Sequence, residues 1–250
     1  MGLFGRKKSY QAEKWNMRTM FGPNMSFAVT EAYKLLRANI MFSFSDEGVG
    51  HVIGVTSSLQ AEGKSSTACN TAYVLAESGA KVLLMDADLR KPTIASKLGL
   101  AKAPGLTNLL VARGDYKELL QHNSMVPGMD VLTSGDIPPN PSELLSSNRM
   151  TKLMKELTEH YDYVIVDLPP VNVVSDAIAM SKVLDGVIMV VRSGVSEQRM
   201  LSEALRQLKL VNVRIMGFVF RDNEVGSRKY KRRYNYRYRK AYTDYAKKRK

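Results

Sequence analysis

The chain has 250 residues, of which 44% are hydrophobic, enough for one large α/β domain with a substantial core. A single cysteine, Cys69, excludes a disulfide framework and a cysteine-rich metal cluster, and it is consistent with a reducing cytoplasm. We expect Cys69 to be a small buried side chain. No apolar run reaches the roughly 18–20 residues of a membrane span. The N-terminal MGLFGRKKS lacks the apolar core of a signal peptide. We therefore expect a cytoplasmic globular protein.

The formal net charge of +13 is concentrated at the C-terminal end. Between Arg221 and Lys250 there are 13 Lys/Arg and 3 Asp/Glu, a net charge of +10, which leaves +3 for the first 220 residues. The domain itself is thus close to neutral. We expect three parts: a flexible basic arm at 1–25, a folded domain at 26–222 and a disordered basic tail at 223–250.

The first predicted element is a helix over 26–44, where Ala32, Leu35, Leu36, Asn39 and Ile40 recur at helical spacing. Three charged residues share one face of this helix, because steps of three residues stay within a narrow arc. They are Glu31, Lys34 and Arg37. This face is either a solvated charge stripe or a contact surface for another subunit.

A phosphate-binding loop follows. The sequence predicts a strand at 51–56, a polar turn, and a helix over 64–78 that Gly79 ends. Backbone N–H groups and the positive end of the helix dipole would hold phosphates. Lys64 would reach the β- and γ-phosphates, and the Ser65 hydroxyl would hold Mg²⁺.

The loop departs from G-x-x-x-x-G-K-[ST], because Ser58 occupies the first glycine position. Gln60 and Ala61 also stand where many such loops carry Gly or Pro. The alternative interpretation is an ordinary helix that opens with Gly-Lys-Ser. The loop residues expected at the nucleotide are Ser58, Gln60, Ala61, Glu62, Gly63, Lys64, Ser65 and Ser66.

Beyond the loop, apolar strands alternate with helices. Strands are predicted at 81–85, 129–133, 163–166, 186–191 and 213–220, and helices at 94–98, 106–111, 116–120, 148–160, 175–184 and 196–210, with one more short helix capped by Ser142. Continuous apolar strands are typical of a sheet covered on both faces. The sequence therefore predicts an α/β fold with a doubly wound, mostly parallel sheet flanked by helices, and ligands at the carboxyl ends of the strands.

Three carboxylates, Asp86, Asp88 and Asp167, lie at or just beyond the ends of predicted strands. Each alone is often only a turn or helix cap. Together they would repel a nucleotide unless a cation intervened, and Mg²⁺ takes such oxygen ligands while bridging to phosphate. Arg90 either contacts phosphate or pairs with an acid.

Several stretches together resemble the bacterial tyrosine kinases known as BY-kinases, which use a P-loop. They are EAYKLLRANI (31–40), VLLMDADLRKP (82–92), PGLTNLL (104–110), SGDIPPNPSELLSS (134–147), VIVDLPP (164–170) and VLDGVIMVVR (183–192). The resemblance covers roughly 26–222 and is closest to the stand-alone cytoplasmic form, in which a separate membrane protein acts as modulator. Two departures are Lys34, where the family pattern Glu-x-x-Arg-x-x-Arg has Arg, and the loop residues Gln60 and Ala61.

The resemblance implies ATP and Mg²⁺ as cofactors and transfer of phosphate to protein tyrosine. It implies that Lys64 and Ser65 bind ATP-Mg²⁺ and that Asp86, Asp88 and Asp167 surround the metal and the attacking tyrosine. We expect Ser65, Asp88 and Asp167 to hold the metal, and Asp86, or else Asp88, to accept the tyrosine proton. The family also implies that the face with Glu31, Lys34 and Arg37 is an oligomer contact, and we expect a ring-like oligomer. It further implies a cytoplasmic segment of a membrane modulator as partner, location at the inner face of the membrane through that partner, and control of capsule or exopolysaccharide synthesis and export.

Competing relatives are the partition-type and iron–sulfur-carrier ATPases. The former carry a second Lys four residues before the Gly of Gly-Lys-Ser/Thr, where this chain has Leu59, and the latter need paired cysteines. An ATP-bound switch or scaffold without kinase activity remains an alternative function.

The C-terminal tail holds half of the 12 tyrosines within 16 residues. They are Tyr230, Tyr234, Tyr236, Tyr238, Tyr242 and Tyr245. Basic residues interleaved with aromatics are also typical of segments that bind nucleic acid or anionic lipid. The resemblance to BY-kinases implies a C-terminal tyrosine cluster that is phosphorylated between subunits, and we expect this of the tail tyrosines. An anionic membrane surface stays compatible with this prediction, and nucleic acid is the less favoured partner.

Overall fold

The computed structural model describes residues 25–44, 48–112, 114–122 and 127–221. The predicted arm at 1–25, apart from Met25, and the predicted tail with its six tyrosines lie outside these ranges, so the domain boundaries stay predictions. No helix in the described part of the chain is long and apolar enough to cross a bilayer.

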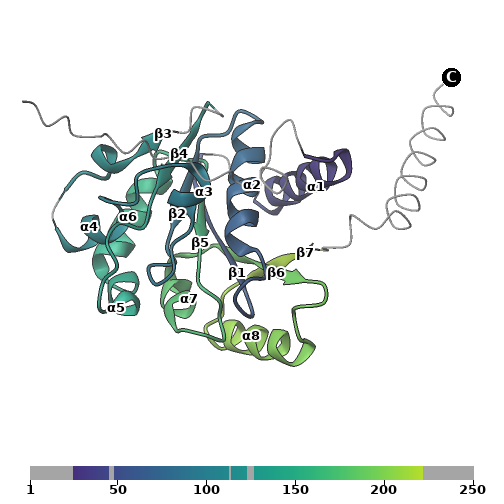
Figure 1. Cartoon of the computed structure of the whole chain (residues 1–250). Coiled ribbons are helices and arrows are strands. Elements are labelled where there is room, and N and C mark those ends of the chain that lie inside the picture. Colours follow the sequence, from purple (N-terminus) through teal and green to yellow (C-terminus); the bar gives the residue numbers. More distant parts are fainter. Residues whose placement is uncertain (1–24, 45–47, 113, 123–126, 222–250) are drawn as a thin grey trace, which may run out of the picture.

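Strands and helices alternate along the chain (Figure 1). The strands are β1 (His51–Ser57), β2 (Val82–Asp86), β3 (Gln121–His122), β4 (Met129–Leu132), β5 (Tyr163–Asp167), β6 (Gly186–Arg192) and β7 (Ile215–Arg221). The α-helices are α1 (Phe27–Ser43), α2 (Lys64–Ala76), α3 (Ile94–Leu98), α4 (Leu106–Val111), α5 (Pro141–Leu145), α6 (Asn148–Thr158), α7 (Asp176–Ala179) and α8 (Gln198–Leu210). Two 3-10 turns, η2 (Tyr116–Leu119) and η3 (Met180–Val183), complete the set.

All seven strands form one sheet in the order β3-β4-β2-β5-β1-β6-β7. Every neighbouring pair is parallel except β3 with β4. Strands β5, β2, β4 and β3 lie on one side of β1, and β6 and β7 lie on the other, which is the doubly wound topology expected from the sequence. This order places β2, β5 and β1 next to one another at the centre of the sheet.

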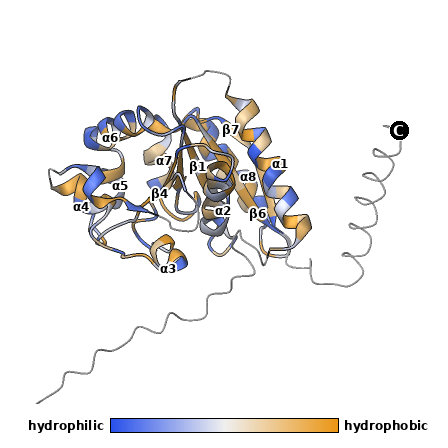
Figure 2. Cartoon of the chain, turned by 90° about the horizontal axis from the view of Figure 1, so that it is seen from above, coloured by the Kyte–Doolittle hydropathy of each residue, from blue (hydrophilic) through white to orange (hydrophobic). Residues whose placement is uncertain are grey.

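Helices cover both faces of the sheet. Successive side chains of a strand point to opposite faces, so Leu83 and Met85 of β2 join the core under α4–α8, whereas Val82 and Leu84 join the core under α1–α3. Figure 2 shows hydrophilic and hydrophobic segments alternating along the outer helices, for example α1 and α6. The buried Cys69 of α2 fills part of the second core, as expected.

The buried face of α1 differs from the prediction. Tyr33 and Ile40 are buried, with Leu36 packed beside them, whereas Leu35 is 58% exposed and Ala32 and Asn39 also face solvent. An apolar residue on a helix is inside only where a neighbour covers it, and α2 covers only the Tyr33–Ile40 side.

Two smaller predictions are also wrong, and one short strand was not predicted. The short helix after the proline-rich loop begins at Pro141 with Asn140 as N-cap, because proline suits the first helical position, so Ser142 is not the cap. The single helix predicted over 175–184 is α7 followed by η3. The two-residue strand β3 was not predicted, since a pair of polar residues carries no strand pattern.

Candidate active site

The three predicted acidic strand ends meet at one edge of the sheet. In the pairing of β2 with β5, Asp86 lies directly opposite Asp167, and Val55 of β1 lies opposite Asp167 on the other side. The phosphate-binding loop leaves the same end of β1. The structure thus brings Lys64, Asp86 and Asp167 together from three separate stretches of sequence.

Two residues of the loop adopt left-handed backbone angles. Gly63 has φ 96° and caps α2, and the Arg221 guanidinium packs so closely on it that a Cβ there would lie 1.5 Å from Nη1. Only glycine fits this position. Ala61 has φ 62°, an unfavourable angle for a residue with a side chain, which explains why a Gly is common there in similar loops.

Glu62 braces the loop from inside. Its carboxylate is fully buried and accepts hydrogen bonds from the Ser58 hydroxyl (2.9 Å), the Leu59 N–H (2.8 Å) and the Ser196 hydroxyl. Both Ser58 and Glu62 were expected at the nucleotide. Their side chains instead hold the loop against the segment after β6, and only their backbone groups remain for phosphate.

Arg192, at the end of β6, supports the same loop and was missed in the sequence. Its Nη1 donates to the Ala61 carbonyl at 2.7 Å, and its backbone N–H donates to the Ser196 hydroxyl at 2.7 Å. Arg192 ends the family-like stretch VLDGVIMVVR, but nothing in that stretch shows that its side chain contacts the loop. Because its guanidinium donates to the carbonyl of Ala61, Arg192 stabilises the conformation of the loop.

Lys64 lies between two carboxylates. Its Nζ is 2.7 Å from Asp88 Oδ2 and 3.3 Å from Asp167 Oδ1, and it donates to the Ser65 hydroxyl at 3.3 Å. Burial alone would lower the pKa of Lys64, but Asp167, Asp88 and Asp86 outweigh burial and raise it. The lysine is therefore fully charged and available for phosphate.

Asp86 is buried and committed to the backbone. Its Oδ2 accepts from the N–H groups of Thr93 (3.1 Å) and Ile94 (3.0 Å), and its Oδ1 accepts from the Asp88 N–H at 3.3 Å. Burial, with the charge of Asp167 added, raises the pKa of Asp86 to about 7. Asp86 thus shapes the turn that carries Asp88, and Asp88 is the member of this pair that faces the cavity.

The residues predicted to hold Mg²⁺ fit that ion. Asp167 is fully buried, and its Oδ2 has no hydrogen-bond partner among the described residues. Because a buried carboxylate oxygen normally has a partner, a bound cation or a hydrogen-bond donor would stabilise it. Burial raises the pKa of Asp167, against the opposing effects of Lys64 and Ser65. Mg²⁺ is usually bound through one or two carboxylates, phosphate oxygens and water, and Ser65 and Asp167 supply oxygen atoms of this kind.

Arg90 pairs with an acid that the sequence did not reveal. Its Nε and Nη2 donate to the two carboxylate oxygens of Asp176 at 2.8 and 3.1 Å. Asp176 is fully buried at the start of α7 and also accepts from the Ser142 hydroxyl. Arg90 thus pairs with an acid in the structure, and its contact with phosphate stays a prediction.

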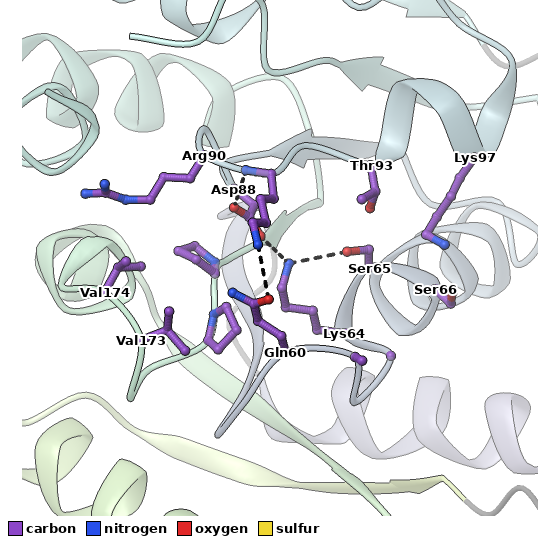
Figure 3. A pocket seen from close by; sticks show the side chains of 15 residues that line it. Gln60, Lys64, Ser65, Ser66, Asp88, Arg90, Thr93, Lys97, Val173 and Val174 are labelled. Atoms are coloured by element: carbon purple, nitrogen blue, oxygen red, sulfur yellow. Dashed lines mark hydrogen bonds and ion pairs between the residues drawn. The ribbon is translucent and has the colours of Figure 1, made fainter. Parts of the chain in front are cut away.

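A cavity of about 400 Å³ opens beside these groups. Figure 3 shows Lys64 in its middle, with Val173 and Val174 on one side and Ser66, Thr93 and Lys97 on the other. Of the predicted site residues, the side chains or backbone of Gln60, Ala61, Gly63, Lys64, Ser65, Ser66, Asp88 and Arg90 line it. The cavity is large enough to admit phosphates and part of an acceptor.

The charged face of α1 forms contacts within the chain. Lys34 pairs with Glu31 at 3.1 Å, as in a solvated stripe, whereas Arg37 donates to the Val74 carbonyl (3.0 Å) and approaches Glu77 (3.7 Å) at the end of α2. The expected oligomer role of this face therefore stays a prediction.

This chain is similar in sequence to known bacterial tyrosine kinases. The family model described as AAA domain matches residues 50–216. The tyrosine-protein kinase YwqD of Bacillus subtilis is 41% identical over 190 residues, which cover 76% of this chain and 79% of that protein. The tyrosine-protein kinase etk of Escherichia coli K12 is 32% identical over 219 residues, which cover 86% of this chain but 30% of that protein.

Solved structures give the same result. The chimerical protein CapA2B2 superposes with a TM-score of 0.76 at 33% identity and covers 84% of this chain and 91% of its own. The septum site-determining protein MinD of Pyrococcus horikoshii, solved with Mg-ADP, has a TM-score of 0.58 at 20% identity and covers 68% of this chain and 70% of its own, a likeness in fold alone.

The sheet order and the phosphate-binding loop define a P-loop nucleotide-binding fold. Within that class the chain belongs to the bacterial tyrosine-protein kinase family, as the identity to YwqD over most of both chains and the match to the AAA domain show.

Proposed function

We propose that this chain is an ATP-dependent protein-tyrosine kinase that phosphorylates its own C-terminal tyrosines between subunits. The main observation behind the proposal is that Lys64, Ser65 and Asp88 line one cavity and that buried Asp167 pairs with Lys64. The chain also belongs to the bacterial tyrosine-protein kinase family. The cofactors are ATP and Mg²⁺.

The reaction needs positioning and neutralisation of charge more than covalent chemistry. A new bond forms between the tyrosine oxygen and the γ-phosphorus, the bond from that phosphorus to the β–γ bridging oxygen breaks, and ADP leaves with the electron pair. Lys64 exchanges its carboxylate partners for phosphate oxygens. Ser65 and Asp167 would hold Mg²⁺, and this ion would neutralise negative charge on the phosphates.

The proton of the tyrosine goes to a carboxylate. Sequence reasoning preferred Asp86 and kept Asp88 as the second choice. We now propose Asp88, because it lines the cavity, whereas Asp86 is fully buried and accepts three backbone N–H bonds. When Lys64 moves to phosphate, Asp88 Oδ2 loses its partner and becomes free to accept the proton.

The folded part of the chain offers poor substrates. Every tyrosine among the described residues is buried or half-buried. The Tyr161 hydroxyl donates to Asp130 at 2.6 Å, and burial raises its pKa. The remaining candidates include the six tail tyrosines, Tyr230, Tyr234, Tyr236, Tyr238, Tyr242 and Tyr245, which supports the tail as the main substrate.

The regulatory part of the proposal rests on charge and on the family. Each phosphate adds about −1.5 to −2 charges, so four to six would cancel or reverse the +10 of the segment from Arg221 to Lys250. An unmodified tail would dock on the acidic site of a neighbour in an oligomer, with α1 as a contact, and a phosphorylated tail would be released.

A membrane modulator would supply an activating cytoplasmic segment. The biological outcome would be control of polysaccharide synthesis and export.

Product analysis tests the proposed activity. The purified full chain is incubated with Mg-ATP, and ADP, inorganic phosphate and phosphotyrosine are measured together. A kinase gives phosphotyrosine in proportion to ADP. Release of inorganic phosphate without phosphotyrosine would instead show an ATP-driven switch, and turnover that requires DNA and falls steeply with salt would show a nucleic-acid-dependent ATPase.

A further inference from the structure

One wall of the cavity is apolar and does not belong to the phosphate-binding machinery. It follows β5 directly and consists of Pro169, Pro170, Val173 and Val174. Val173 is 44% exposed, although no catalytic role in the mechanism above uses it. Figure 3 shows Val173 and Val174 on one side of the cavity, with Lys64 and Asp88 nearer its middle, so an apolar surface lies beside the charged groups.

The wall is held rigidly against the start of the phosphate-binding loop. The Thr56 hydroxyl donates to the Pro169 carbonyl at 2.7 Å, and the Val171 N–H donates to the Ser57 carbonyl at 2.9 Å. The Asn172 side chain donates to the Met200 carbonyl of α8 at 2.7 Å. A wall fixed in this way is present before any ligand binds, so its shape can select a ligand.

The wall lies at the γ-phosphate end of the site. In a phosphate-binding loop the lysine reaches the β- and γ-phosphates, and the serine hydroxyl binds the ion that bridges them. Lys64 is paired with Asp167, and the apolar wall begins two residues after Asp167. Whatever lies on this wall is therefore next to the phosphoryl group that is transferred.

We propose that Pro169, Pro170, Val173 and Val174 bind the aromatic ring of the acceptor tyrosine and direct its hydroxyl toward Asp88. The inference rests on the proposed kinase activity and names a substrate subsite for it. A phenol ring has two apolar faces and a polar tip, so it matches an apolar wall with a lysine and a carboxylate beyond it. The wall would also favour tyrosine over serine and threonine, whose short side chains leave its apolar surface uncovered.

The test uses neutral substitutions, because the tail is strongly basic and a new carboxylate would attract it by charge alone. The double variant Val173→Asn/Val174→Asn is made in the full chain. Val111→Asn is the control, since Val111 is also exposed but does not line the cavity. The acceptor is a synthetic peptide of residues 228–250, and the affinity for Mg-ADP is measured separately with a fluorescent ADP analogue.

The expected result is an increase of about tenfold or more in KM for the peptide, with the affinity for Mg-ADP within twofold of the unmodified chain. Val173→Ile/Val174→Ile should keep the KM, and Val111→Asn should change neither quantity. Weaker Mg-ADP binding with an unchanged peptide KM would overturn the proposal and assign the wall to the nucleotide, and no change in either would also overturn it. If the unmodified chain phosphorylates no tyrosine at all, the proposed function fails first and the subsite with it.

If the double variant melts at a lower temperature, Val173→Thr, which keeps the shape of valine, replaces it. The KM for the peptide should again increase.

Discussion

At the scale of single residues, Ala61 carries a measurable strain. A left-handed backbone at a residue with a Cβ costs about 1 kcal/mol relative to glycine. Ala61→Gly should therefore raise the free energy of unfolding by up to about 1 kcal/mol, as chemical denaturation of the nucleotide-free chain would measure. The matched control is Ala112→Gly, because Ala112 is also exposed but has φ −87°, so that variant should lose stability. Equal effects of both changes would contradict the strain at Ala61.

The buried carboxyl of Asp86 gives a pH-dependent stability. Its pKa is raised to about 7, whereas an unfolded Asp titrates near 4, so between these values the folded chain binds more protons than the unfolded chain. This group therefore adds stability that is present at low pH and is lost as pH rises toward 7.

Asp86→Asn removes this contribution. Without nucleotide and Mg²⁺, the Tm of the variant minus the Tm of the unmodified chain should be larger at pH 8 than at pH 5. The comparison across pH cancels any fixed packing cost of the amide. A Tm difference that does not depend on pH would show that Asp86 is ionised throughout this range.

Some residues of the site could be identified from the sequence, and others could not. Lys64, Ser65 and the three Asp residues could be found because each stands in a motif or at a strand end. Asp176 and Arg192 could not, since their importance comes from contacts with residues about 86 and 131 positions away, and no local pattern encodes such contacts. The roles of Ser58 and Glu62 in bracing the loop were hidden for the same reason.

At the scale of elements, Asp176 ties three segments together. It joins the turn after β2, through Arg90, to the first turns of α7 and α5. Asp176→Ala should lower kcat about tenfold to a hundredfold, because the turn that carries Asp88 loses its anchor, with a smaller effect on Mg-ADP affinity. Steady-state kinetics with the peptide acceptor measures the split.

A comparable surface pair provides the control for this prediction. Arg206 contacts Glu203 on α8 with the same two-bond geometry, but both side chains are exposed. Glu203→Ala should leave kcat unchanged, because exposed ion pairs contribute little. An equal loss in Glu203→Ala and Asp176→Ala would show that the effect is general destabilisation.

The order and type of most elements follow from the sequence. Apolar strands buried on both faces leave continuous hydrophobic runs, which is why β1, β2, β5 and β6 were predicted. The exposed face of α1 was misassigned because periodicity finds an apolar stripe but does not tell which side a neighbouring helix covers. The two-residue strand β3 exists only through its pairing with β4.

At the scale of the whole molecule, the account separates a nearly neutral domain from a basic, tyrosine-rich tail. Changing all six tail tyrosines to Phe should remove nearly all phosphotyrosine formed in Mg-ATP, while ADP binding stays the same. The control changes half-buried Tyr73 and Tyr163 of the folded domain to Phe and should keep the label. Full labelling of the six-Phe chain would exclude the tail as the main substrate.

Phosphorylation should also alter assembly. Reversal of the tail charge would weaken its attraction to an acidic site on a neighbour, so the phosphorylated chain should sediment as smaller species than the unmodified chain at the same concentration. The six-Phe chain, treated with Mg-ATP in parallel, should not change. Identical sedimentation before and after phosphorylation would contradict the proposed switch.

The central claim is that Lys64 and the carboxylates beside it transfer phosphate to tyrosines of a neighbouring chain. The most direct measurement mixes Lys64→Met chains, which keep the tail, with six-Phe chains, which keep the site, in Mg-ATP and maps phosphotyrosine by mass spectrometry. The account predicts phosphate on the tail of the Lys64→Met chain in the mixture and none when that chain is incubated alone. Phosphotyrosine on the Lys64→Met chain alone, or none in the mixture, would contradict it.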